Sequence, residues 1–124
     1  MKFPIAVMIV GLLGTPGLLV ASVPARGQSS AAEKKSSKVA EGVARGKTQF
    51  KGNCVICHFE TSDKKKVGPG LKGFGTRTTF ADGTKITDAR IHDLIANGGK
   101  DMPPFLETMS DAQIRDLIAY LKTL

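Results

Sequence analysis

The feature that most constrains this chain is the placement of its two cysteines. Cys54 and Cys57 are separated by two residues, and His58 follows the second cysteine directly. Two thiols at this spacing, at the end of a helix, can reach the two vinyl groups along one edge of a porphyrin. The histidine after the second thiol is then carried beneath the iron. The pattern therefore predicts one covalently attached haem of the c type, held by Cys54, Cys57 and His58.

Other uses of two cysteines leave part of this pattern without a role. A disulfide or a dithiol redox pair would leave His58 idle, and a thioredoxin-like motif also requires a βαβ pattern that the sequence lacks. A structural zinc site normally needs four ligands, and the adjacent Cys57 and His58 make poor co-ligands. An iron–sulfur cluster normally needs four cysteines, whereas the chain has two. Haem attachment is therefore the preferred interpretation.

The N-terminus is typical of an export signal. Lys2 supplies a positive start to an apolar run at residues 5–13, and small residues further on permit cleavage after Ala25 or Gly27. We therefore expect residues 1–27 to be a cleavable signal peptide and the mature protein to be periplasmic. An exported protein is also free to keep oxidised or modified thiols.

A retained membrane anchor is the alternative to cleavage. Residues 3–23 are long enough to span a bilayer, and the protein would then be tethered to the membrane and face the periplasm. The interruption of the apolar run at residues 14–17 and its small-residue end favour the cleaved signal.

The charge balance bears on the partners of the mature chain. Removal of residues 1–27 takes away two of the 18 basic residues and none of the 11 acidic ones, which leaves a formal charge of +5. Two ionised haem propionates would lower this charge by about two units. The mildly basic balance favours redox proteins with acidic docking surfaces as partners. Nucleic acid is not expected, because the lysines are scattered and no aromatic platform lies among them.

The sequence divides into a tail and one folded domain. Residues 28–38 are small, polar and charged, which predicts a flexible tail. The domain is expected to cover residues 39–124, and its glycine-, proline- and threonine-rich stretch at 61–85 is expected to be loop. No convincing strand pair is found, so the expected fold class is all-α.

Three helices are predicted in this domain, over residues 39–52, 88–97 and 111–124. The third has the strongest support, because Ser110 and Gln113 form a capping box before an apolar stripe at helical spacing. In the first helix, Gly42 and Gly46 weaken the helix and indicate the close approach of another backbone.

Taken together, these motifs resemble those of the class I c-type cytochromes, a family of small mono-haem proteins. The resemblance rests on an opening helix with the cysteine motif, a proximal loop, a methionine loop and a C-terminal helix, at residues 46–58, 67–73, 102–105 and 116–122. It extends over about residues 41–124. It implies a small cytochrome c fold, in which three main helices and long loops surround one covalent haem c.

The resemblance also implies roles for individual residues. The carbonyl of Pro69 would accept a hydrogen bond from His58, which fixes the ring and raises its basicity. Leu71 would pack on the haem, although it could equally belong to the core. Met102 would be the second axial iron ligand, since a thioether is soft, neutral and suited to low-spin haem iron. Tyr120 would meet the first helix where the first and third helices cross.

Two residues compete with Met102 as iron ligands. Met109 directly precedes the Ser110 cap and is expected in the core, whereas His92 lies off the apolar face of its helix and is expected at the surface.

The sequence indicates the roles of three other groups of residues less specifically. The chain has no tryptophan to bind a haem propionate, which leaves Thr76, Arg77 and Thr78 as candidates, and Phe59 has no assigned role. The lysines at 64–66 are expected to be a solvated loop, with a docking patch as the alternative.

The function implied is one-electron transfer between exported or membrane redox partners, by a protein that is not itself an enzyme. With His58 and Met102 on the two axial positions, iron could change oxidation state with little rearrangement, and the methionine would raise the reduction potential. One alternative is a cytochrome subunit of a specific dehydrogenase or oxidase complex. Another is a haem ligand-binding or peroxidase-like protein, which would need an open iron site.

Overall fold

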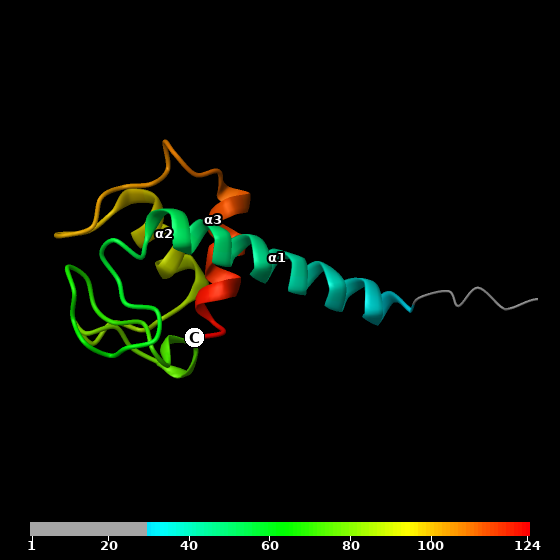
Figure 1. Ribbon diagram of the computed structural model, residues 1–124, viewed down its shortest axis with the longest axis horizontal. Coiled ribbons are helices and arrows are strands. Elements are labelled where there is room, and N and C mark those ends of the chain that lie inside the picture. The colour runs from blue at the N-terminus through cyan, green and yellow to red at the C-terminus, as the bar shows by residue number, and fades with distance from the viewer. Residues whose placement is uncertain (1–29) are drawn as a thin grey trace, which may run out of the picture.

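The fold consists of three α-helices joined by long loops (Figure 1). A computed structural model describes residues 30–124, so the expected signal peptide at 1–27 lies outside the described residues. The helices are α1 (Ala31–Asn53), α2 (Asp88–Asn97) and α3 (Asp111–Leu121), and a short 3₁₀ turn η1 covers Phe74–Thr76. Residues 30–124 contain no β-strand, only isolated bridges between Thr79 and Lys85 and between Gly99 and Met102. The all-α prediction is confirmed.

Helices α1 and α3 cross in close contact, and this crossing is the framework of the fold (Figure 1). A Cβ atom at Gly46 would overlap the backbone carbonyl of Asp116 and lie 2.8 Å from the Cβ of Tyr120. The missing side chain therefore lets the two backbones meet, as the sequence predicted. Beside this contact, the Nε of Arg45 donates to Asp116 at 2.6 Å, and the rings of Phe50 and Tyr120 lie 5.7 Å apart.

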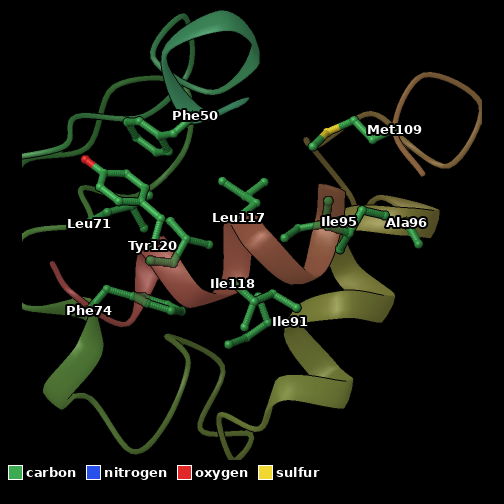
Figure 2. Packing of buried hydrophobic residues seen from close by; sticks show 12 residues of the cluster. Phe50, Leu71, Phe74, Ile91, Ile95, Ala96, Met109, Leu117, Ile118 and Tyr120 are labelled. Carbon is green, nitrogen blue, oxygen red and sulfur yellow. The ribbon is translucent and has the colours of Figure 1, made fainter. Parts of the chain in front are cut away.

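The core lies between the three helices and receives side chains from the loops (Figure 2). The predicted apolar stripe of α3 is buried, and Ile114 and Leu117 of this stripe are almost fully inaccessible. In Figure 2, Ile91 and Ile95 of α2 lie against Leu117 and Ile118 of α3. Burial of these apolar side chains supplies the main driving force for packing α2 onto α3.

Helix α1 begins earlier than the sequence predicted. It starts at Ala31 instead of residue 39, so the flexible tail predicted over 28–38 is wrong for residues 31–38. The cause is a capping box in which Ser30 accepts from the backbone N–H of Glu33 and Glu33 accepts from that of Ser30. Alanine, glutamate and lysine, which favour helices, follow the cap. This exposed half of α1 extends beyond the other helices (Figure 1).

The other helices follow the predictions closely. Helix α2 has the predicted bounds, with the Thr87 side chain accepting from Arg90 at its start and Gly98 at its end with a φ of 78°. Helix α3 has the predicted Ser110–Gln113 capping box and ends at Leu121, three residues before the predicted end at 124. No helix in the described part of the chain is long and apolar enough to cross a membrane.

The helix crossing predicts opposite effects for two alanine substitutions in α1. Gly46→Ala should lower the free energy of unfolding by about 1–3 kcal/mol or more, because the new methyl group overlaps the backbone of α3. Gly52→Ala should instead raise it by up to about 0.5–1 kcal/mol, since nothing lies within 4 Å of a Cβ there. Urea unfolding of both variants measures the effects. Equal free energies for the two variants would contradict the close contact at Gly46.

Candidate haem-binding site

The two cysteines lie in a tight turn that follows α1 directly. Cys54 is the C-cap of α1, and its N–H still donates to the carbonyl of Phe50 at 2.8 Å. The carbonyl of Cys54 then accepts from the N–H groups of Cys57 and His58, at 3.0 and 2.8 Å. Residues 54–59, called here the cysteine turn, thus gather the three residues that the sequence assigned to haem attachment. Both thiols are free and half-buried.

The Cys54 thiol lies in surroundings that do not favour a thiolate. Burial, together with the neighbouring Cys57, raises the pKa of Cys54 to about 11. Redox-active cysteines show the opposite, because a lowered pKa makes the reactive thiolate available. The raised pKa of Cys54 therefore fits a thiol used for attachment better than the reactive thiol of a dithiol redox centre.

The imidazole of His58 is held by its Nδ1 atom. Nδ1 lies 2.8 Å from the carbonyl oxygen of Pro69, which can only accept, so Nδ1 carries the proton. In this tautomer Nε2 keeps its lone pair and is the atom that can bind a metal. A side chain at Gly68 would overlap the same ring, with its Cβ 2.8 Å from Nε2. The predicted hydrogen bond between His58 and Pro69 is therefore present, and Gly68 leaves room for the ring.

A second segment runs along the cysteine turn and holds it in place. Within this proximal segment, residues 66–71, the N–H of Gly68 donates to the Cys57 carbonyl at 2.9 Å and that of Leu71 to the Phe59 carbonyl at 2.8 Å. The Leu71 side chain is buried in the core. Together with the His58 contact, these bonds tie the turn to a loop that is more than ten residues away along the chain.

Arg77, one of the predicted propionate partners, takes part in this arrangement in another way. Its guanidinium donates to the carbonyl of Gly70 at 3.0 Å and to that of Lys72 at 2.6 Å. Arg77 therefore stabilises the end of the proximal segment through these two carbonyl groups. Thr76, a second candidate, donates its hydroxyl to the carbonyl of Gly73 within η1.

Met102 reaches the core from a different loop, after α2. Its backbone pairs with Gly99, with the Gly99 N–H donating to the Met102 carbonyl at 2.9 Å. Gly98 has a φ of 78°, and a Cβ there would lie 2.9 Å from the nitrogen of Pro104, so the loop closes tightly around this glycine. The Met102 side chain is half-buried and packs against the core. This loop holds the backbone of Met102, and its side chain is only partly buried.

The two competitors of Met102 have other partners. Met109 is only 3% exposed and belongs to the core, where the sequence placed it. The Nε2 of His92 lies 3.3 Å from a carboxylate oxygen of Asp111 at the start of α3, and the imidazole is partly exposed. The surroundings of both side chains are therefore explained by contacts with other residues of the chain.

Sequence reasoning missed one long-range contact near the site. The hydroxyl of Tyr120 on α3 donates to the carboxylate of Glu60, two residues after His58. Burial, the hydrogen bond to Glu60 and the negative charge of Glu60 raise the pKa of Tyr120 to about 12. No local signal could have found this pair, because its two members lie 60 residues apart.

The donor set fits a haem better than a bare metal ion. Residues 30–124 contain no group of three or more histidine, cysteine and acidic side chains that could hold an ion by themselves. A haem brings its own four nitrogen ligands and needs only axial ligands from the protein. His58 with its free Nε2, two neighbouring thiols for attachment and the thioether of Met102 match that requirement.

Comparisons with known proteins point the same way. Residues 41–121 match the family described as cytochrome C oxidase, cbb3-type, subunit III. The chain is 31% identical to a cytochrome c6 of Picosynechococcus sp. over 85 residues, which cover 66% of this chain and 73% of that protein. It is 31% identical to a cytochrome c6 of Limnospira maxima over 88 residues, which cover 64% of this chain and 89% of that protein.

The contact between Tyr120 and Glu60 predicts an unusual titration. Tyr120 is the only tyrosine in the chain, so the ultraviolet absorbance of tyrosinate reports on it alone. We expect ionisation near pH 12 in the folded protein and near pH 10 in urea. Because the folded pKa is the higher one, the stability linked to this group is full below about pH 10 and is lost as the pH rises through 12.

Two variants check the assignment. Glu60→Gln should lower the pKa of Tyr120 but leave it above 10, since burial remains the largest cause of the shift. Tyr120→Phe should abolish the tyrosinate signal and serves as the blank. A pKa near 10 in the folded wild-type protein would show that the hydroxyl is neither buried nor bonded to Glu60.

Proposed function

The chain belongs to the family of small mono-haem c-type cytochromes, and on this premise we propose that it carries single electrons through one covalent haem c. Cys54 and Cys57 attach the haem through two thioether bonds, and His58 is the first axial ligand. The observation that carries this proposal is the imidazole of His58, held through Nδ1 by Pro69 beside two free thiols at the end of α1.

The residues of the chain prepare this site in three ways. The carbonyl of Pro69 holds the Nδ1 proton of His58, which keeps the ring in one orientation and makes Nε2 a better donor. The cysteine turn and the proximal segment are fixed to each other, so the ring cannot swing away. The side chain of Leu71 in the proximal segment is buried in one core cluster with side chains of α3, which anchors the segment to the core. When bound, a haem supplies the one-electron chemistry.

Met102 is the proposed second axial ligand. Its side chain is only partly buried, on a loop closed by Gly98, whereas the side chain of Met109 is buried in the core. A neutral sulfur ligand favours the ferrous form and raises the reduction potential. Two axial protein ligands also leave no open position for a substrate. This supports a carrier over the ligand-binding or peroxidase-like alternative.

One second candidate is favoured by a specific observation. The matching family takes its description from subunit III of an oxidase, so a place in an oxidase or dehydrogenase complex is the alternative to a freely diffusing carrier. Co-purification of the cytochrome with such an enzyme in mild detergent separates the two. A carrier that docks transiently should elute alone.

The partners of the carrier are proposed to be redox proteins with acidic docking surfaces. Lys64 and Lys65 are exposed next to the proximal segment, and they add to the positive charge of the mature chain. Opposite charges speed the encounter of two proteins, and salt screens this attraction. No nucleic-acid partner is proposed.

Export places the carrier in the periplasm, with residues 1–27 removed. N-terminal sequencing of the protein recovered from the periplasm should start at Arg26 or Gln28, because small residues precede both positions. A membrane-bound product that starts at Met1 would contradict cleavage. It would instead support a tethered cytochrome that faces the periplasm.

The assignment of the second ligand predicts different results for two methionine variants. The ferric protein should be low-spin and show the weak long-wavelength absorption of sulfur–iron ligation. Met102→Ala should remove that absorption, admit carbon monoxide to the ferrous protein and lower the reduction potential. Absorption spectra with and without carbon monoxide measure the first two effects, and a redox titration measures the reduction potential.

Met109→Ala is the matched control. It should keep the long-wavelength absorption and lower the free energy of unfolding by about 2–5 kcal/mol, because it opens a cavity in the core. The reverse pattern would make Met109 the ligand. A high-spin wild-type spectrum with ready binding of carbon monoxide would refute the carrier and favour a ligand-binding protein.

A further inference from the structure

Two side chains at the haem site, those of Phe59 and Lys66, have no role in the function proposed so far. Phe59 leaves 39% of its surface exposed directly after His58, and three lysines follow one another at residues 64–66. The structure joins these features through Lys66. Its Nζ atom donates to the carbonyl of Val55 at 2.7 Å and lies 5.4 Å from the centre of the Phe59 ring.

We propose that Lys66 is a positioning residue for the haem site. Its ammonium group fixes the carbonyl between the two cysteines and keeps one positive charge next to the cysteine turn. The side chains of Lys64 and Lys65 remain available to contact redox partners. This inference rests on the proposed function, because the charge acts on the reduction potential of the bound haem.

Three carbonyl groups along the cysteine turn accept hydrogen bonds at alternate residues. The carbonyls of Val55, Cys57 and Phe59 all accept from the proximal segment. The donors for the last two are backbone N–H groups, of Gly68 and Leu71. For Val55 no backbone donor is found within residues 30–124, and the side chain of Lys66 takes its place. Lys66 therefore completes the set of bonds that orients the turn.

Lys66 is itself held both at its backbone and at its ammonium group. Its backbone N–H donates to the carbonyl of Gly68 at 2.9 Å, and the N–H of Gly68 in turn donates to Cys57. At the other end, the face of the Phe59 ring attracts the ammonium group through a cation–π contact. A lysine restrained in this way keeps its charge at one place, whereas a free surface lysine moves through solvent.

The neighbouring lysines lack these restraints. In the described part of the chain, the side chains of Lys64 and Lys65 make no hydrogen bond, ion pair or cation–π contact, and both are exposed. Lys65 therefore provides a matched control. It has the same charge, lies one position away in the same loop, and makes no hydrogen bond or cation–π contact with the cysteine turn.

A positive charge near haem iron disfavours the ferric form, which carries one charge more than the ferrous form. Loss of Lys66 should therefore lower the reduction potential. Because the charge lies at the surface, the effect is modest, about two- to threefold in the ratio of ferrous to ferric protein. At 59 mV per tenfold for one electron, this corresponds to about 20–30 mV.

The experiment compares the full matured protein with Lys66→Met, Lys66→Arg and Lys65→Met by redox titration at low and high salt. We expect Lys66→Met to lower the potential at both salt concentrations. Lys66→Arg should restore it, since arginine keeps the charge, the donor and the contact with Phe59. The shift in Lys65→Met should be smaller and vanish at high salt. Equal shifts for the two methionine variants at both salt concentrations would overturn the proposal.

A second measurement on the wild-type protein does not depend on the potential. Brief treatment with acetic anhydride, followed by peptide mass spectrometry, gives the acetylation rate of each lysine. Lys66 should react several times more slowly than Lys64 and Lys65 in the native protein and at the same rate in urea. Equal native rates would overturn the proposed contact. A preparation without haem would refute the proposed function instead, while the acetylation rates would still report on Lys66.

Discussion

The contact between α1 and α3 at Gly46 is the constraint on which the site depends. Because no side chain separates the two backbones there, Phe50 packs against Tyr120 and the end of α1 is fixed relative to the core. Cys54 is the cap of that helix, so the crossing also fixes where the cysteine turn begins. A contact between two helices thus determines the position of the residues that are proposed to hold the haem.

The cysteine turn is shaped locally but oriented by a distant segment. The carbonyl of Cys54 closes the turn on itself, and the proximal segment then bonds to one side of it and to the ring of His58. Met102, the proposed second axial ligand, lies on a third loop, which the Gly99–Met102 bridge and the close packing at Gly98 hold together. Support from three separate segments suits an electron carrier, since a site held on several sides can change charge with little movement of the protein.

The sequence predicted those features whose determinants are local. The cysteine spacing alone predicts the haem attachment site, and the Ser110–Gln113 box with the apolar period of α3 predicts that helix. The hydrogen bond between Pro69 and His58 is expected only from the family resemblance. The early start of α1 differs from the prediction, because the small, polar composition after Ser30 is typical of a tail, whereas the Ser30–Glu33 capping box begins a helix there. The Tyr120–Glu60 and Lys66–Val55 contacts could not be predicted, since each joins residues that only the folded chain brings together.

The central claim is that this chain binds one haem covalently through Cys54 and Cys57. The most direct test is the intact mass of the protein, produced with haem-maturation machinery, after extraction with acidified acetone. We expect a mass increased by one haem, with the colour remaining in the protein, and loss of that increase when both cysteines are replaced by serine. Haem that is released into the solvent, or a mass that corresponds to two haems, would contradict it.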